Sequence, residues 1–153
     1  MMTWVCGYDD RESVNVCLLY RYIISYEPRN FRGHLEELPL TLEYGKKVDA
    51  LRKRYQAFLW DAEFQDTVGA TIEIVGEGPE GGNSIVYSVF RRTDSERKAV
   101  ILVNNNRAPI TARVDTGWRS RFIAVSPEHP EPRTVNAQVQ IPSRSAIVVM
   151  ESN

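Results

Sequence analysis

Cysteine and histidine are scarce in this chain of 153 residues, which contains two of each. Cys6 and Cys17 are too few and too far apart for a zinc knuckle or a CxxC redox site. His34 and His129 lie in stretches rich in proline, glycine or glutamate, without a cysteine or carboxylate cluster at the spacing of metal ligands. We therefore expect no metal site and no cofactor, and we interpret both histidines as surface residues.

The sequence also lacks a charge excess and a long hydrophobic run. Lys and Arg number 19 against 20 Asp and Glu, which gives a formal net charge of −1. This balance gives the chain no electrostatic attraction to nucleic acid or to an anionic membrane. The longest apolar run, residues 16–24, is broken by Arg21 and is far shorter than the roughly 20 residues of a membrane span. With no visible signal peptide, these features predict a soluble, cytoplasmic protein.

Complete catalytic motifs are missing as well. A (β/α)8 barrel needs roughly 250 residues, and there is no GxSxG nucleophile elbow. The stretch GEGPEG at 76–81 fits GxGxxG, but a strand-like segment follows it instead of the helix that a dinucleotide site needs, so we interpret it as a hairpin loop. The acidic pairs Asp9–Asp10 and Glu36–Glu37 are sequence neighbours, whereas glycosidase carboxyls lie roughly 5 to 9.5 Å apart across a sugar. Helix capping and surface solvation explain these pairs.

The residues that are present change character near residue 65. Before it, apolar side chains recur at helical spacing, which predicts helices over residues 11–25 and from Leu40 to Trp60, joined by an irregular connection. Asp9 or Asp10 can cap the first helix. That helix is apolar nearly all round, with one face formed by Val14, Leu18 and Tyr22 and another by Cys17 and Ile24.

After Gly69 the apolar period becomes two, which is typical of half-buried strands. Seven strands are predicted, over residues 71–75, 84–90, 98–103, 109–116, 120–125, 133–141 and 146–150. Residues 98–103 are apolar on both faces, as in a central strand, and turn-forming residues separate the strands. The predicted fold class is α+β and mainly β: a seven-stranded antiparallel β-sandwich over residues 66–153, preceded by two α-helices within residues 1–65. We expect the sandwich to be stable without the helices.

Several segments resemble the C-terminal region of α-amylase-type (β/α)8-barrel glycoside hydrolases, where the last barrel helices precede a β-sandwich. AVILVNN before an alternating strand and IPSRSAIVVMES after a polar strand match the sandwich, and LLYRYIISYEP resembles the penultimate helical region. The last barrel helix of the family reads approximately "LR..Y...L", which is matched by Leu51, Arg52, Tyr55 and Leu59. The family's catalytic carboxylates lie at the ends of barrel strands that this chain has no room for. The resemblance therefore implies a non-catalytic accessory region, a fragment or remnant of a larger protein, and no catalytic residue.

Exposed aromatic side chains suggest alternatives. Trp118 follows Gly117 in a turn and is the best candidate for stacking on a sugar, although packing of Trp60 and Trp118 between helix and sandwich is the reading we favour. The alternative functions are a free-standing carbohydrate-binding module and a protein-interaction module that uses exposed N-terminal helices. Because one neighbouring helix cannot cover both apolar faces of the first helix, we also expect a homo-oligomer through the N-terminal helices, or contact with a missing barrel domain.

Overall fold

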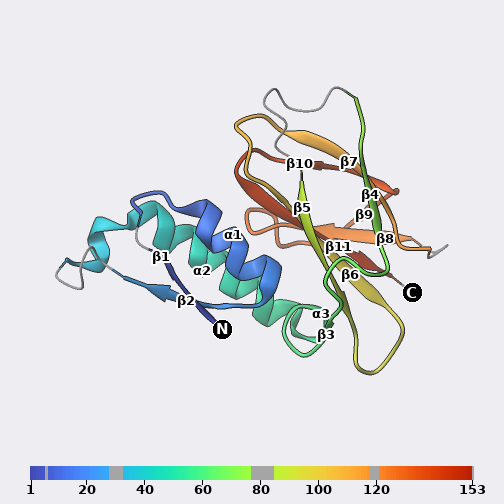
Figure 1. The fold of residues 1–153 in the computed structure, drawn as a ribbon, viewed down its shortest axis with the longest axis horizontal. Coiled ribbons are helices and arrows are strands. Elements are labelled where there is room, and N and C mark those ends of the chain that lie inside the picture. The colour runs from blue at the N-terminus through green and yellow to red at the C-terminus, as the bar shows by residue number, and fades with distance from the viewer. Residues whose placement is uncertain (6, 28–32, 77–84, 118–120, 153) are drawn as a thin grey trace.

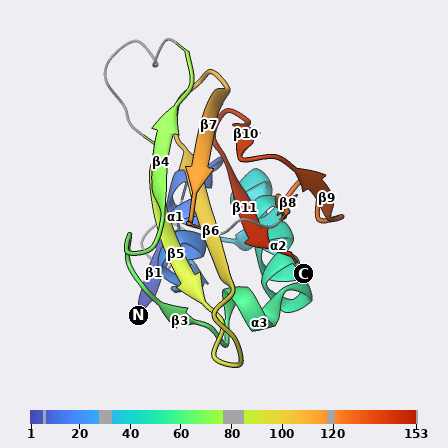
Figure 2. The ribbon, with the colours of Figure 1, turned by 90° about the vertical axis from the view of Figure 1, so that its right-hand side faces the viewer.

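The chain forms three layers in a computed structural model that describes residues 1–5, 7–27, 33–76, 85–117 and 121–152 (Figure 1). A layer of helices covers one face of a six-stranded sheet, and a three-stranded sheet covers the other face. Figure 2 shows the three-stranded sheet in front of the six-stranded sheet and the helices behind it. The predicted α+β class with an antiparallel sandwich is confirmed.

The N-terminal layer consists of two consecutive strand–helix units. Its elements are β1 (Met2–Val5), α1 (Arg11–Tyr20), β2 (Ile23–Tyr26), a 3₁₀ turn η2 (Leu35–Glu37), α2 (Pro39–Arg54) and α3 (Gln56–Leu59). Strands β1 and β2 pair in parallel, with Met2 opposite Ile23. The helix predicted over 11–25 is wrong beyond residue 20, because Arg21 adopts a left-handed conformation with φ of 56° and caps the helix. The β-branched Ile23 and Ile24 then favour a strand.

The second predicted helix is interrupted. Its continuous span from Leu40 to Trp60 is divided at Tyr55, whose φ of −112° ends α2 before the short α3 begins. The Tyr55 hydroxyl donates a hydrogen bond of 2.8 Å to the carbonyl oxygen of Pro130, which ties this break to a sandwich loop. Helix α2 starts with a proline in its first turn, where the missing N–H has no intrahelical partner to lose. Over the described ranges, no helix combines the length and apolarity needed to cross a bilayer.

The six-stranded sheet has the order β3-β5-β6-β11-β8-β9, and the three-stranded sheet the order β10-β7-β4. The strands of the larger sheet are β3 (Glu63–Phe64), β5 (Val86–Arg91), β6 (Lys98–Asn104), β8 (Phe122–Val125), β9 (Arg133–Val135) and β11 (Ser145–Glu151), and those of the smaller sheet are β4 (Thr71–Ile74), β7 (Ile110–Asp115) and β10 (Gln138–Ile141). All neighbouring strands in both sheets run antiparallel.

Within the part of the chain that the structure describes, the sandwich therefore has nine strands where seven were predicted. The segment 133–141 reads as one strand by its alternation, but it divides after Val135 and contributes β9 to one sheet and β10 to the other. The second additional strand, β3, is only two residues long. Its pairing with β5 brings residues 63 and 64 into the sandwich, although the predicted domain boundary at 65/66 itself stays a prediction.

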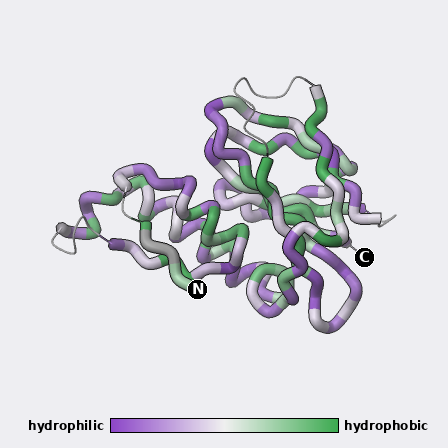
Figure 3. Tube along the Cα trace, viewed as in Figure 1, coloured by the Kyte–Doolittle hydropathy of each residue, from purple (hydrophilic) through white to green (hydrophobic). Residues whose placement is uncertain are grey.

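Strands β6 and β11 lie in the middle of the larger sheet, where Figure 3 colours the chain mainly as hydrophobic. Their side chains are buried on both faces of the sheet. Side chains that point to the helices include Ile101, Val103 and Val148, which join a core with Val14, Leu18 and other residues of the helical layer. The alternate positions, such as Leu102 and Val149, pack against the three-stranded sheet. This two-sided cover confirms the central position predicted for residues 98–103.

Asn104, at the end of β6, is fully buried and organises the loops at this end of the sheet. Its amide nitrogen donates to the carbonyl oxygens of Ala108 and Pro142 at 2.9 and 3.0 Å, and its side-chain oxygen accepts the backbone N–H of Asn106 at 2.9 Å. Buried polar groups are stable only when they are paired in this way. The asparagine that ends the strand in AVILVNN thus joins the β6–β7 turn to the loop before β11.

Gly45 lies in the interior of α2, where the hydroxyl of Tyr26 from β2 packs on it. A Cβ atom at this position would lie 1.9 Å from the Tyr26 hydroxyl oxygen. The glycine costs about 1 kcal/mol of helix propensity relative to alanine. A glycine fits this position because β2 and α2 approach each other too closely for any side chain.

Replacing Gly45 with alanine should therefore destabilise the protein despite the better helix propensity, by about 1 to 3 kcal/mol as overpacking usually does. Among the described residues, the Tyr26 hydroxyl has no hydrogen-bond partner, so Tyr26→Phe alone should change stability little. Combined with Gly45→Ala, it should recover part of the loss, because the added Cβ meets the hydroxyl first. Urea denaturation of the four proteins measures this coupling, and an identical loss with and without the hydroxyl would contradict it.

A fragment of residues 66–153 should be less stable than the whole chain and should self-associate. Without the helices, the face of the sheet that carries Phe90, Ile101 and Val148 is uncovered, and contiguous apolar patches of this kind drive association. This reverses the expectation from the sequence that the sandwich is stable without the helices. Thermal unfolding and light scattering of both proteins provide the test. A monomeric fragment with the melting temperature of the whole chain would instead support two independent domains.

Candidate functional site

The two parallel strands end at the same edge of their small sheet. In parallel α/β folds, functional side chains follow the carboxyl ends of the strands. The described acidic residues at this edge are Asp9 and Asp10 after β1 and Glu27 after β2. Hydrogen bonds from Thr41, at the start of α2, to the Gly7 carbonyl oxygen and from the Asp10 N–H to the Thr41 hydroxyl close the edge.

Asp10 has the capping role that the sequence predicted. One of its carboxylate oxygens accepts the backbone N–H of Ser13 at 3.2 Å, at the N-terminus of α1. This bond satisfies one of the amides that the first turn of a helix leaves unpaired. Asp10 is thus held in the turn by its own helix and by Thr41.

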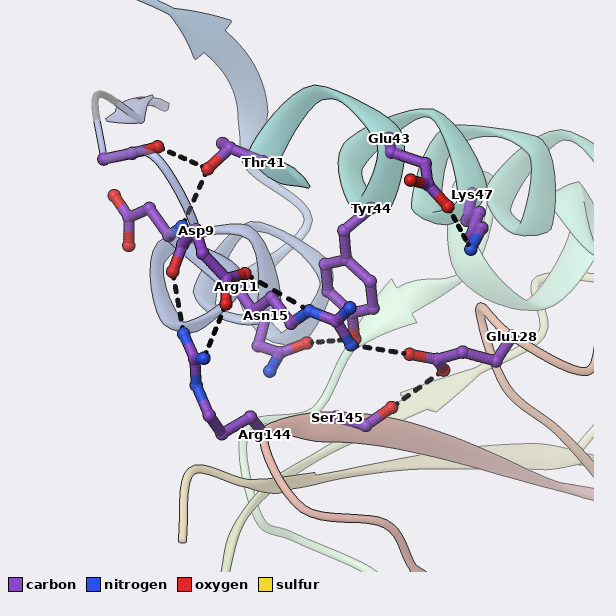
Figure 4. Close-up of polar contacts among 12 residues, drawn as sticks. Asp9, Arg11, Asn15, Thr41, Glu43, Tyr44, Lys47, Glu128, Arg144 and Ser145 are labelled. Atoms are coloured by element: carbon purple, nitrogen blue, oxygen red, sulfur yellow. Dashed lines mark hydrogen bonds and ion pairs between the residues drawn. The ribbon is translucent and has the colours of Figure 1, made fainter. Parts of the chain in front are cut away.

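The sequence predicted a capping or solvated surface position for Asp9. In the structure, Asp9 instead belongs to an ion-paired junction between the helical layer and the sandwich (Figure 4). Arg144, which lies directly before β11, donates to the Asp9 carboxylate at 2.6 Å and to its backbone oxygen at 2.7 Å. Arg11 approaches the other carboxylate oxygen at 3.4 Å. One carboxylate therefore joins residues that are 135 positions apart in the chain.

The junction continues from Arg11 into the interior. Arg11 donates to Glu128 at 3.2 Å, and the second oxygen of Glu128 accepts the hydroxyl of Ser145 at 2.9 Å. The Arg11 guanidinium also lies 4.8 Å from the ring centre of Tyr44. Burial raises the pKa of the Tyr44 phenol well above its usual range, and its hydroxyl donates to Asn15 at 2.7 Å. These contacts position the helices on the sheet, and they occupy the carboxylates of Asp9 and Glu128.

Other residues considered in the sequence have structural or surface positions. His34 and His129 are exposed, as predicted. The Glu37 carboxylate accepts the His34 N–H at 3.2 Å and caps the 3₁₀ turn, whereas Glu36 is exposed. Among the residues that the structure describes, no group of three or more His, Cys, Asp and Glu could hold a metal ion. Trp118 lies outside the described residues, as do positions 77–81 of GEGPEG.

A cavity of about 270 Å³ lies beside the C-terminal half of α2 and the end of α3. Its lining consists of Asp49, Arg52, Lys53, Gln56 and Trp60. Trp60 was expected to pack between helix and sandwich, but its side chain remains 41% exposed and borders this cavity. Sequence reasoning considered Trp60 only for stacking or packing, and it missed the cavity. The spacing of 49, 53, 56 and 60, which places these residues along one side of a helix, is the signal that could have found it.

Arg52 is the fixed cation of the cavity. The residue is only 4% exposed, and its guanidinium donates to the carbonyl oxygen of Cys17 at the end of α1. It also lies 3.6 Å from the Asp49 carboxylate and 5.4 Å from the ring centre of Trp60. Burial lowers the pKa of Arg52, and Asp49 opposes that shift. Nearby, burial and then the charge of Asp49 raise the pKa of Tyr26 to about 12.

Comparison with known proteins relates the fold, rather than the sequence, to glycoside hydrolases. No family model and no curated protein matches the sequence. Among solved structures, a GH30 endoxylanase from Clostridium papyrosolvens aligns with 99% of this chain and 41% of its own, at 10% identity and a TM-score of 0.52. An α-amylase from Geobacillus thermoleovorans, complexed with acarbose, aligns with 94% of this chain and 34% of its own, at 15% identity and a TM-score of 0.52.

These likenesses cover nearly all of this chain but well under half of each enzyme. At such low identity they show a shared fold alone. The fold of the strand–helix units and sandwich is therefore similar to a region of glycoside hydrolases. This agrees with the kind of protein that the sequence resembles.

Removing either partner of the Asp9–Arg144 pair should destabilise the junction. We expect Asp9→Ala and Arg144→Ala each to cost about 1 to 2 kcal/mol, allowing for partial exposure, and the double variant to cost less than their sum. Arg91→Ala, which breaks an exposed pair with Glu63, is the control and should change stability little. Urea denaturation provides the values, and additive losses at Asp9 and Arg144 would contradict a direct interaction.

Proposed function

We propose that this chain is a non-catalytic accessory region of a glycoside hydrolase-like protein, in which two strand–helix units end a parallel barrel and the sandwich supports them. The observation that carries the proposal is the parallel pairing of β1 with β2. The helices that follow these two strands share a hydrophobic core with the sandwich. Parallel sheets occur almost only where helices and further strands cover them. A pair of short parallel strands is therefore best understood as the end of a larger sheet.

The exposed edges of the β1–β2 pair support the proposal that it is the end of a larger sheet. Among the described strands, β1 and β2 pair only with each other, so each has an edge without a neighbouring strand. Met2 and Ile23, at the start of the two strands, are 55% and 56% exposed. Exposed edges and apolar strand residues are what additional strands would cover.

The partner that fits this surface is a polypeptide that adds parallel strands to β1 and β2, namely the rest of a barrel domain. The faces of α1 on which an oligomer through the helices was predicted are largely covered by the chain itself, since Val14, Cys17 and Leu18 are each at most 1% exposed. Tyr22 and Ile24 are partly buried against the same core. The open strand edges, rather than these helix faces, are the contact region in the proposal.

The substrate class of the parent protein is a carbohydrate in this proposal. Two of the proteins with a similar fold are an endoxylanase and an α-amylase. In this chain, Asp9 is ion-paired and Asp10 caps a helix. Of the described acidic residues at the carboxyl ends of β1 and β2, Glu27 is then the remaining candidate for chemistry. A single carboxylate does not form the pair that glycoside hydrolysis requires.

The chain by itself should therefore show only background hydrolysis of aryl glycosides and oligosaccharides. The measurement is product release over a panel of glucosides, xylosides and galactosides, with Glu27→Gln as the informative variant and Glu37→Gln as a control. Turnover that is lost in Glu27→Gln and retained in Glu37→Gln would overturn the accessory role.

A further inference from the structure

We propose that the cavity beside Trp60 binds a neutral pyranose sugar. The inference does not depend on the accessory role, because it uses only side chains of α2 and α3 and their contacts. Its support is a partly exposed indole ring next to several polar side chains, of which Arg52, Asp49 and Gln56 are held by hydrogen bonds or an ion pair. Ligand sites typically combine an apolar wall with a few such groups.

Trp60 supplies the apolar wall. The Arg52 guanidinium lies over the ring at 5.4 Å from its centre, and 41% of the residue is still exposed. The backbone of Trp60 is also fixed, because its N–H donates to Gln56 at 2.8 Å and its carbonyl oxygen accepts from Arg21 at 2.9 Å. The C–H face of a pyranose is flat and apolar, and it packs well on an aromatic ring.

The polar side chains match the hydroxyl groups of a sugar, which both donate and accept hydrogen bonds. Asp49 supplies acceptors and Lys53 supplies donors. The Gln56 amide nitrogen donates to Asp61 at 2.9 Å, which leaves its amide oxygen as an acceptor. Arg52 is buried, and its guanidinium Nε is a buried donor without a hydrogen-bond partner among the described residues.

The lining carries one net charge. The charges of Arg52 and Asp49 offset each other at 3.6 Å, which leaves the exposed Lys53 as the single net charge of the lining. An exposed charge is strongly screened by water and salt, so Lys53 alone adds little affinity for an anion. The Asp49 side chain is 47% exposed and can still accept the hydroxyl groups of a neutral pyranose, which requires no further counter-charge.

The position of the cavity separates it from the strand ends. Arg21, two residues before β2, donates to the carbonyl oxygens of Trp60 and Ala62. The start of α2, by contrast, is bonded to Gly7 and Asp10 beyond the end of β1. The cavity thus lies at the N-terminal end of β2, opposite the edge where parallel folds place catalytic groups. A sugar here would be held rather than cleaved.

Titration of the whole chain with maltohexaose, xylohexaose and cellohexaose, each alone, tests the proposal by calorimetry and tryptophan fluorescence. A ligand of this size in a shallow cavity should bind with a dissociation constant of about 1 mM. Trp60→Ala should weaken binding about tenfold or more, Trp60→Phe should retain most of it, and Gln56→Ala should weaken it. Lys46→Ala, an exposed change elsewhere on α2, should leave it unchanged, and thermal unfolding verifies that each variant is folded.

Three results would overturn the proposal. The first is no saturable binding of any of the three sugars at concentrations well above the expected dissociation constant. The second is binding that persists in Trp60→Ala, or binding only of an acidic trimer of galacturonate. The third is a concentration-dependent dimer, seen by light scattering, that Trp60→Ala abolishes, because the cavity would then be a protein contact. None of these results changes the hydrolysis assay, so the accessory role and the sugar site fail separately.

Discussion

The structure depends on covering both faces of the central strands β6 and β11. All seven residues of β11 and six of the seven in β6 are buried, so neither face can be left to solvent. The three-stranded sheet covers one face and the helical layer covers the other. Because burial of apolar surface is the dominant favourable term in folding, the helices are needed to complete one of the two cores, and the three-stranded sheet completes the other.

Apolar packing has little directionality, and the polar junction supplies the orientation between helices and sheet. Two arginines with a left-handed backbone conformation make polar contacts of this orienting kind, one within the junction and one at the end of α1. Arg144 has a φ of 50° and binds Asp9, and Arg21 has a φ of 56° and binds the carbonyl oxygens of Trp60 and Ala62. Glycine would adopt these backbones more easily. Arg144 reaches from the sandwich to the helical layer, and Arg21 joins the end of α1 to the segment after α3. The long cationic side chain gives each strained residue a function that glycine lacks.

The sequence was sufficient for elements whose pattern reflects one local cause. Alternation along residues 110–115 predicted β7, and the two-sided apolar pattern of 98–103 predicted a central strand, because burial of each side chain follows directly from its position. The start of α1 was also predictable, since Asp10 has the chemistry of a cap.

Features that depend on distant contacts were not predictable. Residues 21–26 have helix-compatible apolar spacing, and only the left-handed Arg21 and the pairing with β1 make them a strand. The division of 133–141 between two sheets also depends on partners far along the chain. At the candidate site, the side chains on one flank of α2 were visible in the sequence, but the cavity required Arg52 to be buried against α1. Pairing between Asp9 and Arg144 has no sequence signal, because 135 positions separate them.

The position of β11 has a consequence for the order of folding. Among the described strands it comes last along the chain, yet it lies between β6 and β8 in the larger sheet. Until β11 is in place, the sheet consists of two separate halves with unpaired edges, and the helices have an incomplete surface to pack on. Contacts between residues far apart in the chain must first overcome the entropy of loop closure. The larger sheet is therefore completed by a central strand rather than by an edge strand.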